Sequence, residues 1–149
     1  RDVAPSRGLG DVYKEDLEPL AREKDVELTG NCEAITIVGS DILIYRLVYN
    51  LVENAIKYNH PGGQVTVNAS RKEKHVCLSV ADTGNGIPEE LRERVFEPFF
   101  RVDKSRSRAL GGVGLGLALV HEIVRVHDGN ITVRSNPSGG TVFEVMFTQ

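Results

Sequence analysis

The chain of 149 residues is long enough for one domain with its own hydrophobic core, and no second domain needs to be assumed. Its 40% hydrophobic and 26% charged residues exclude collagen-like, low-complexity and wholly disordered proteins, and its net charge of -3 argues against general nucleic-acid binding. The two cysteines, Cys32 and Cys77, form no spaced cluster, which excludes a disulfide framework or cysteine zinc site and makes a reducing compartment the default. No apolar run approaches the roughly 20 residues that span a bilayer, and the first residues lack the basic-then-apolar layout of a signal peptide. Because the sequence begins at Arg1, we expect it to be part of a longer protein.

Periodicity and turn residues predict a chain of alternating helices and strands. Residues 1–12 mix charge with Gly and Pro, so we expect a linker or disordered arm there and a domain over 13–149. Asp41 is the expected N-cap of the clearest helix, and Gly30 and Asn31 are the expected turn between two strands. In chain order the predicted elements are a helix over 14–24, strands over 26–29 and 34–38, a helix over 41–58, a hairpin of strands over 64–72 and 75–82, a short helix over 88–95, an amphipathic helix ending at about His127, and strands over 130–136 and 141–147. This order predicts an α+β fold with helices on one face of a largely antiparallel sheet.

Glycines gather in the second half of the chain. Six of the fifteen lie between Gly84 and Gly116, and four of those are in the sequence GGVGLG at 111–116, directly before a helical pattern. A glycine-rich helix start can bind an anion, because free N–H groups and the positive end of the helix dipole point to the same place. A flexible surface loop explains the glycines equally well. No GKS or GKT follows and no buried strand precedes, which excludes a P-loop and a dinucleotide-binding fingerprint.

Polar residues on the predicted 41–58 helix form a second candidate. Asn50 and Asn54 are four residues apart and share a face, with Arg46 one turn before and Lys57 one turn after. Carboxamide oxygens are suitable ligands for Mg²⁺, which also takes water and phosphate oxygens. A solvated polar face is the alternative explanation for this pair.

Asp82 ends a predicted strand and enters the glycine-containing turn TGNG. It is either a simple turn former or an acceptor for an exocyclic amine such as that of adenine. The segment RVDKSRSR at 101–108 carries four cations, and it is either a solvated loop or a screen for phosphate charge. The four histidines are not spaced as zinc ligands, and we interpret all of them as structural or facing solvent.

Four segments, taken together, resemble a known family. NLVENAIKYN, DTGNGIP, FEPFFRVDKSRSR and GGVGLGLALV are similar, in this order, to the N, G1, F and G2 boxes of the ATP-binding catalytic domains of two-component sensor histidine kinases. These domains belong to a superfamily with gyrase, Hsp90 and MutL. The resemblance covers about residues 36–148 and ends with GGTVFEV, which is similar to the last strand of the family. It implies a two-layer α/β sandwich of the Bergerat type, with a mostly antiparallel mixed sheet, helices on one face and a mobile ATP lid.

The resemblance implies ATP and Mg²⁺ as ligands, and assigns residues to the metal and the phosphates. Asn54, with Asn50, would hold Mg²⁺. Lys57 would contact phosphate, and Arg101 and Arg106 would approach the γ-phosphate. The resemblance also implies that Gly112, Val113, Gly114, Leu115 and Gly116 wrap the phosphates, although many relatives carry Thr or Ser at the position of Val113.

The same resemblance assigns the base pocket and the lid. Asp82 would accept the adenine amine, and Tyr58 would line the pocket. The lid would run from about Phe96 to Val113, with Phe99 and Phe100 packing within it. The pocket would further include Gly84, Gly86, Ile87 and Thr141. The sequence departs from many relatives at Asn59 and His60, where Thr-Pro is common.

The phosphate acceptor of the family is a histidine in a separate helical dimerisation domain, in a pattern like HExRTPL. None of the four histidines has that context, so the resemblance implies a catalytic domain whose acceptor lies elsewhere in the parent chain. The implied partners are ATP, the dimerisation and phosphoacceptor domain, and the receiver domain of a response regulator, with no nucleic acid. The parent would be a homodimer anchored in the cell membrane, with this domain in the cytoplasm.

Three other functions share the fold. An ATP hydrolase of the gyrase and Hsp90 type needs a Glu as general base where Asn50 stands, and Glu53 points about a third of a turn away from Asn54. A non-catalytic nucleotide-binding module and a serine kinase of the anti-sigma type remain open, because the fragment does not encode turnover or the acceptor.

Overall fold

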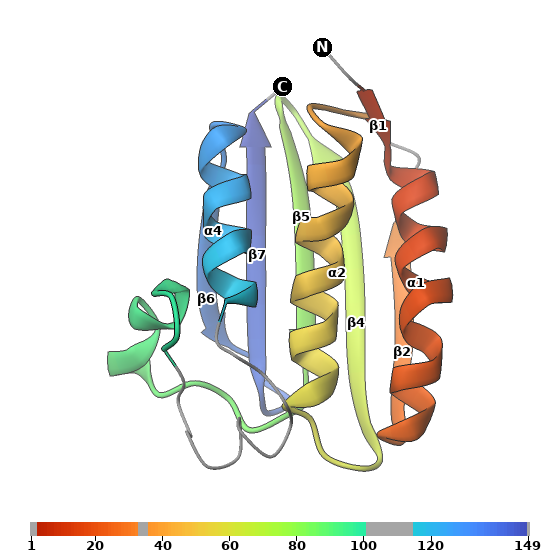
Figure 1. Ribbon diagram of the computed structural model, residues 1–149, viewed down its shortest axis with the longest axis vertical. Helices are drawn as coiled ribbons and strands as arrows, with labels where there is room; N and C mark the ends of the chain where they lie inside the picture. Colours follow the sequence, from red (N-terminus) through yellow and green to blue (C-terminus); the bar gives the residue numbers. More distant parts are fainter. Residues whose placement is uncertain (1–2, 33–35, 101–114, 149) are drawn as a thin grey trace.

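The computed structural model describes residues 3–32, 36–100 and 115–148, with side chains described for 13–30, 37, 39–100 and 115–148 (Figure 1). In chain order the elements are β1 (Val3–Pro5), α1 (Ser6–Glu23), β2 (Val26–Cys32), β3 (Thr36–Val38), α2 (Asp41–Lys57), β4 (Gly63–Lys72), β5 (His75–Asp82), the 3-10 turns η1 (Glu89–Leu91) and η2 (Arg94–Phe96), α4 (Gly116–Val126), β6 (Asn130–Ser135) and β7 (Thr141–Thr148).

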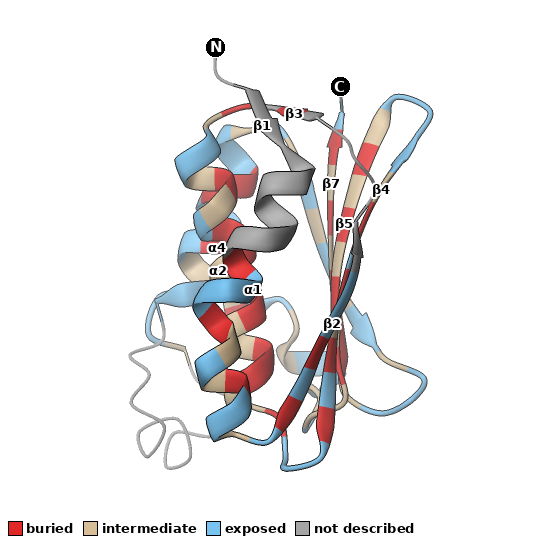
Figure 2. Cartoon of the chain, turned by 90° about the vertical axis from the view of Figure 1, so that its right-hand side faces the viewer, coloured by how far each residue is buried: buried red, intermediate tan, exposed pale blue. Residues whose placement is uncertain are grey.

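A five-stranded mixed sheet forms one layer, in the order β2-β4-β5-β7-β6. The β4–β5, β5–β7 and β6–β7 pairs are antiparallel, and β2 lies parallel to β4 with Val26 opposite Gly63. A separate antiparallel pair joins β1 to β3. Helices α1, α2 and α4 lie side by side on one face of the large sheet (Figure 2). The predicted α+β sandwich with a largely antiparallel sheet is therefore confirmed, as are the β4–β5 and β6–β7 hairpins.

The hydrophobic core lies between the two layers. Helix α2 buries one continuous stripe and contacts both neighbouring helices and the sheet below. Strand β5 alternates, with Val76, Leu78 and Val80 facing the helices. Each fully buried aliphatic side chain contributes roughly 1.5–3 kcal/mol. The stripe on α2 consists of Ile44, Leu47, Val48, Leu51, Val52, Ala55 and Ile56.

The N-terminal part differs from the sequence prediction. The segment 1–12, predicted to be a linker, instead contains β1 and the first turns of α1, which begins at Ser6 rather than at 14. Gly8 and Gly10 each lower helix propensity by about 1 kcal/mol, which hides these turns from a reading of local pattern. Tyr13, Leu17 and Ala21 bury the inner face of α1 in the common core. That the domain begins at residue 13 stays a prediction.

Three local predictions are corrected. Gly30 and Asn31 do not form a turn, because parallel pairing with β4 carries β2 through both residues. Ser40 rather than Asp41 caps α2, with its hydroxyl oxygen accepting the N–H of Leu43 at 3.3 Å. The predicted helix over 88–95 consists of the two short 3-10 turns η1 and η2.

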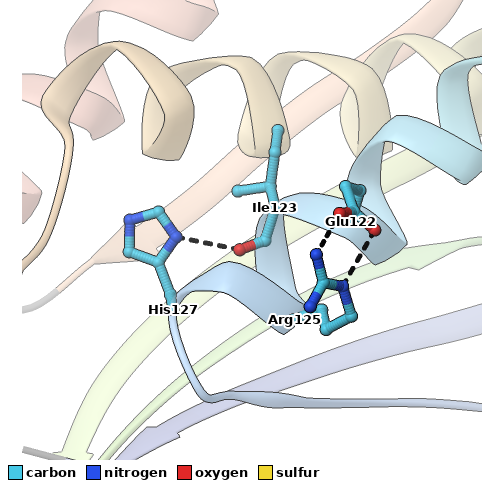
Figure 3. A network of polar contacts seen from close by, with 4 residues as sticks. All are labelled: Glu122, Ile123, Arg125 and His127. Carbon is cyan, nitrogen blue, oxygen red and sulfur yellow. Dashed lines mark hydrogen bonds and ion pairs between the residues drawn. The ribbon is translucent and has the colours of Figure 1, made fainter.

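Helix α4 ends in polar contacts that involve His127 (Figure 3). The Nδ1 atom of His127 donates to the carbonyl oxygen of Ile123 at 2.8 Å and so closes the last turn. Glu122 and Arg125 form an exposed ion pair on the same helix. The structural interpretation of His127 is thus confirmed.

The two ends of the long axis carry different parts of the chain (Figure 1). β1 and the end of β7 lie at one end. The C-terminal end of α2, the end of β5 and the start of β7 lie at the other, which we call the Asp82 edge. Within the described residues, no helix combines the length and the apolar character needed to cross a membrane.

Candidate active site at the Asp82 edge

Most of the predicted site residues that the structure describes gather at the Asp82 edge. The C-terminal end of α2 meets the loop after β5, because the N–H of Asn85 lies 3.4 Å from the carbonyl oxygen of Tyr58. The start of β7 meets the same loop, because the N–H of Thr141 donates to Asp82 Oδ1 at 3.2 Å. The end of α2 and the start of β7, each more than 20 residues from Asp82 in sequence, thus both lie close to it.

Asp82 is a buried carboxylate with only one of its oxygens engaged. Its side chain is at the end of β5 and the residue is 8% exposed. Oδ1 accepts the N–H of Gly84 at 2.9 Å and that of Thr141, whereas Oδ2 takes no hydrogen bond from the described residues. Burial raises the pKa of Asp82 above its ordinary value, and the two N–H bonds act in the opposite direction. One oxygen is therefore left for a donor from outside the protein.

The loop after β5 depends on glycine for its close approach to α2. A Cβ on Gly84 would overlap the carbonyl oxygen of Tyr58. Gly86 has a φ of +75°, in the region that favours glycine, and Ile87 packs against the edge of the core. Gly84 lies beside the Asp82 carboxylate, and the predicted roles of Gly84, Gly86 and Ile87 in shaping a base pocket stay predictions.

Asn50 and Asn54 occupy successive turns near the end of α2, as predicted. The amino group of the Asn50 side chain is enclosed and has no hydrogen-bond partner among the described residues. Asn54 is partly exposed one turn later. An enclosed amino group with an unfilled hydrogen bond fits a site in which a ligand supplies the acceptor. Carboxamide oxygens near the negative end of a helix dipole also suit a cation such as Mg²⁺.

Lys57 and Tyr58 end the helix. Lys57 Nζ lies 3.9 Å from a carboxylate oxygen of Glu53, and both side chains are partly exposed. Such a pair contributes little to stability, so Lys57 can exchange Glu53 for another anion. Tyr58 is the C-cap of α2, and its N–H donates to the carbonyl oxygen of Asn54 at 3.1 Å.

Asn59 is a site residue that the sequence analysis noted only as a departure from relatives. It is 6% exposed, and its Nδ2 donates to the carbonyl oxygen of Gln64 at 3.0 Å. Its Oδ1 accepts the N–H of His60 at 2.9 Å and faces the Thr83 hydroxyl at 3.4 Å. Asn59 therefore joins the end of α2 to β4 and to the loop that begins after Asp82.

Two other groups were missed by the sequence analysis. Asn136, in the β6–β7 turn, donates from Nδ2 to the carbonyl oxygen of Asp82 at 2.8 Å. Arg92 donates to the carbonyl oxygen of Ile87 at 3.3 Å and to the Ser135 hydroxyl at 2.6 Å, which ties the loop to the end of β6. No local pattern could have identified either contact, since the partners are 54 and 43 residues apart.

The beginning of the predicted lid is only partly described. Phe96 packs against the rings of His121 and Phe143, with centroid distances of 5.4 and 6.1 Å, so it is anchored to α4 and β7. Phe99 is 68% exposed and has a φ of +67°, and the Arg94 guanidinium lies over the Phe100 ring at 4.6 Å. Packing of Phe99 and Phe100 within a closed lid stays a prediction.

The predicted phosphate contacts outside α2 are described by the structure only at the start of α4. Leu115 and Gly116 begin α4, are exposed, and have no side-chain N-cap bond. The predicted site residues outside the described residues are Arg101, Arg106, Gly112, Val113 and Gly114.

Comparisons with known proteins agree with the resemblance. A family model described as "Histidine kinase-, DNA gyrase B-, and HSP90-like ATPase" matches residues 39–149. The sensor-like histidine kinase SenX3 of Mycobacterium tuberculosis is 42% identical over 133 residues, which cover 85% of this chain and 32% of SenX3. The chain thus spans about a third of the length of that relative.

Two solved structures give the same result. The mycobacterial sensor histidine kinase MprB has a TM-score of 0.83 at 29% identity, covering 99% of this chain and 96% of that one. Full-length ShkA in complex with AMPPNP has a TM-score of 0.81 at 29% identity, covering 98% of this chain and 31% of that one. The chain therefore belongs to the family of histidine kinase-, DNA gyrase B- and HSP90-like ATPases, within its sensor histidine kinase group.

Proposed function

We propose that this chain binds ATP with Mg²⁺ and transfers the γ-phosphoryl group to a histidine on another domain of its parent protein. The observation that carries this proposal is the buried Asp82 carboxylate with Oδ2 left without a partner among the described residues. A carboxylate oxygen without a protein partner can accept a donor from a ligand, and the exocyclic amine of adenine supplies one. Guanine presents a carbonyl oxygen at that position, which a carboxylate repels. Asp82 thus favours ATP over GTP.

Asn54 and Asn50 are the proposed holders of Mg²⁺. The oxygen-donor chemistry of both carboxamides and their shared face on α2 support this assignment, while the enclosed Nδ2 of Asn50 is a donor left for an acceptor atom of the ligand. The ion, when bound, would offset negative charge on the triphosphate.

Lys57 is the proposed phosphate contact, since its Nζ needs only to leave the partly exposed carboxylate of Glu53. Arg101 and Arg106 stay in the proposal on the strength of the resemblance, as do Gly112, Val113 and Gly114. In the transfer, a nitrogen of the incoming imidazole forms a bond to the γ-phosphorus as the bond to the β,γ-bridging oxygen breaks. ADP leaves, and the other nitrogen of the imidazole ring loses its proton. The protein contributes mainly positioning and charge.

Transfer is favoured over hydrolysis by the residues near Asn54. Asn50 cannot take a proton from water at neutral pH. Glu53 is the neighbouring carboxylate, and it is paired with Lys57 rather than placed on the face of Asn50 and Asn54. No general base for water therefore stands on that face of α2.

The parent protein is proposed from the family alone. A chain that spans about a third of SenX3 leaves room for the dimerisation domain that carries the acceptor histidine. We propose a homodimeric, membrane-anchored sensor with this domain in the cytoplasm and a response-regulator receiver domain as the next acceptor.

Nucleotide binding is tested by calorimetry with AMPPNP and with the matching guanine analogue, each with and without Mg²⁺. We expect tighter binding of the adenine analogue and a Mg²⁺-dependent gain that is lost in Asn54→Ala. The matched control is Asn68→Ala, on the exposed part of β4, which should bind as wild type does. Equal affinity for the two analogues would remove the adenine role of Asp82, and an unchanged Mg²⁺ dependence would remove Asn54 from the site.

Phosphoryl transfer is tested with γ-labelled ATP. The chain alone should remain unlabelled, and adding the histidine-bearing domain of the parent should label that domain with an acid-labile, base-stable phosphoramidate. Acid-stable label on a serine would identify a serine kinase instead. Release of phosphate without labelled protein would identify a hydrolase, and label on His121 or His127 would contradict the assignment.

A further inference from the structure

The turn between β6 and β7 packs directly against the main chain of Asp82. Asn136 uses both ends of its carboxamide in this contact. Its Oδ1 accepts the N–H of Ser138 at 3.2 Å, and its Nδ2 donates to the carbonyl oxygen of Asp82 at 2.8 Å. The side chain is therefore fixed within its own turn while it holds a residue 54 positions away.

The turn itself is closed by two backbone hydrogen bonds. Asn136 N–H donates to the carbonyl oxygen of Gly140 at 3.1 Å, and Gly139 N–H donates to that of Asn136 at 2.8 Å. Gly140 has a φ of +97°, and a Cβ there would overlap the carbonyl oxygen of Asp82 and lie 2.7 Å from its Oδ1. Contact this close leaves the turn and the Asp82 edge little freedom to move separately.

The turn and the first residue of β7 contact both the main-chain carbonyl and the side-chain carboxylate of Asp82. Asn136 holds its main-chain carbonyl, and Thr141, the first residue of β7, donates to its carboxylate. A fixed carbonyl fixes the peptide plane after Asp82, and that plane sets the direction in which the chain continues to Gly84. The N–H of Gly84 is the second donor to Oδ1. Holding the carbonyl therefore also holds the carboxylate.

We propose that Asn136 is a positioning residue for recognition of a 6-aminopurine. It holds Asp82 so that Oδ2 stays aligned with the exocyclic amine, and it does not touch the nucleotide itself. This inference rests on the proposed function, because it takes Asp82 as the acceptor for that amine. Loss of the Asn136 contact should weaken binding of the base and leave the transfer of the phosphoryl group at the far end of the nucleotide unchanged.

Two nucleotides that differ only in the amine provide the test. ATP and purine riboside triphosphate, which lacks the exocyclic amine, are compared for Kd with Mg²⁺ by calorimetry. A hydrogen bond to a charged acceptor predicts that the wild type prefers ATP by roughly 10-fold or more. In Asn136→Ala this preference should fall by at least about threefold, while affinity for purine riboside triphosphate changes little. In transfer assays the KM for ATP should rise with kcat unchanged.

A second variant separates the Asp82 contact from the turn. Asn136→Asp keeps an oxygen for the Ser138 N–H but replaces the Nδ2 donor with an oxygen that repels the Asp82 carbonyl. It should lose the ATP preference even though the turn is retained. Asn130→Ala, an exposed Asn on β6, is the matched control and should keep the wild-type preference.

The outcomes distinguish this inference from the function on which it rests. If the wild type binds both nucleotides equally, Asp82 does not recognise the amine and the proposed base recognition fails. If the wild type prefers ATP and both Asn136 variants keep the full preference while only their melting temperatures fall, Asn136 is merely structural and the inference is overturned.

Discussion

His127 and Ser40 are joined by a hydrogen bond across 87 residues of sequence, from the Ser40 N–H to the Nε2 atom of His127 at 3.2 Å. Because Nδ1 already donates to Ile123, a neutral imidazole with its proton on Nδ1 satisfies both contacts. The ring thus links the last turn of α4 to the first turn of α2. Helices that carry the two ends of the proposed phosphate site are held together at their opposite ends.

His127→Ala should lower the free energy of unfolding by about 1–3 kcal/mol, because a backbone donor and a backbone acceptor lose their partner. Gly39→Ala should also destabilise the protein, since its methyl group would overlap the His127 ring. When both changes are combined, Gly39→Ala should cause little further loss in the free energy of unfolding beyond that of His127→Ala. Urea unfolding of the four proteins measures this coupling, and strictly additive costs would contradict it.

Gly140 and Gly139 form a matched pair for testing the close approach to Asp82. Both have positive φ, +97° and +93°, but a Cβ on Gly139 meets nothing within 4 Å whereas one on Gly140 overlaps Asp82. Gly139→Ala should cost about 1 kcal/mol from backbone strain alone and leave nucleotide affinity intact. Gly140→Ala should cost more and weaken ATP binding at least about tenfold, the change that corresponds to 1.4 kcal/mol. Equal effects of the two changes on affinity would show that the close contact between Gly140 and Asp82 does not contribute to ATP binding.

Asp82→Asn should stabilise the protein without nucleotide at neutral pH. Burial raises the pKa of Asp82, so the folded protein holds its proton more tightly than the unfolded chain does. Stability from this group is therefore lost as the pH rises from the ordinary value of 3.8 through the raised value. Asn keeps an oxygen for Gly84 and Thr141 and carries no charge. We therefore expect a higher melting temperature for Asp82→Asn than for wild type at pH 7.

The pH dependence supplies the control for that prediction. The difference in melting temperature between Asp82→Asn and wild type should shrink towards zero as the pH falls below 3.8, where both side chains are neutral. The same variant should lose its preference for ATP over purine riboside triphosphate. A variant that is less stable than wild type at neutral pH would indicate that the ionised carboxylate stabilises the fold.

Asn59→Ala should destabilise the protein and weaken nucleotide binding together. The change leaves the N–H of His60 without its partner, whereas the carbonyl oxygen of Gln64 loses Asn59 but keeps the N–H of Thr83 at 3.2 Å, so we expect a cost of about 1–3 kcal/mol in total. Asn59→Thr, which supplies a hydroxyl group that can both donate and accept, should recover part of both losses. Thermal unfolding and calorimetry measure the two effects, with the exposed Asn68→Ala as control. A loss of stability with full affinity would show that Asn59 does not position the site.

The fold and the site motifs were predictable where their signal is local. Seven apolar residues at helical spacing predicted α2 to within a residue at its C-terminal end, and alternation predicted the β4–β5 hairpin. The N-terminal turns of α1 and the passage of β2 through Gly30 and Asn31 were not predictable. There, packing and strand pairing outweigh the local preferences of glycine and asparagine.

The site shows the same division. Asp82 and Asn54 lie within short motifs, so the sequence alone identified them as candidates. Asn136 contacts the Asp82 carbonyl and Arg92 contacts the Ser135 hydroxyl, each across more than 40 residues of sequence, and nothing in the neighbouring residues signals these contacts. The candidate ligand-binding residues could thus be predicted from sequence motifs, whereas the residues that position them became identifiable only from the three-dimensional structure.

The opposite placement of the chain ends and the Asp82 edge has a practical consequence (Figure 1). Strand β1 and the end of β7 lie at the end of the long axis opposite the Asp82 edge, so a fluorophore or a surface tether attached at either end leaves the Asp82 edge clear. Immobilisation through either end therefore suits the nucleotide-binding measurements described above.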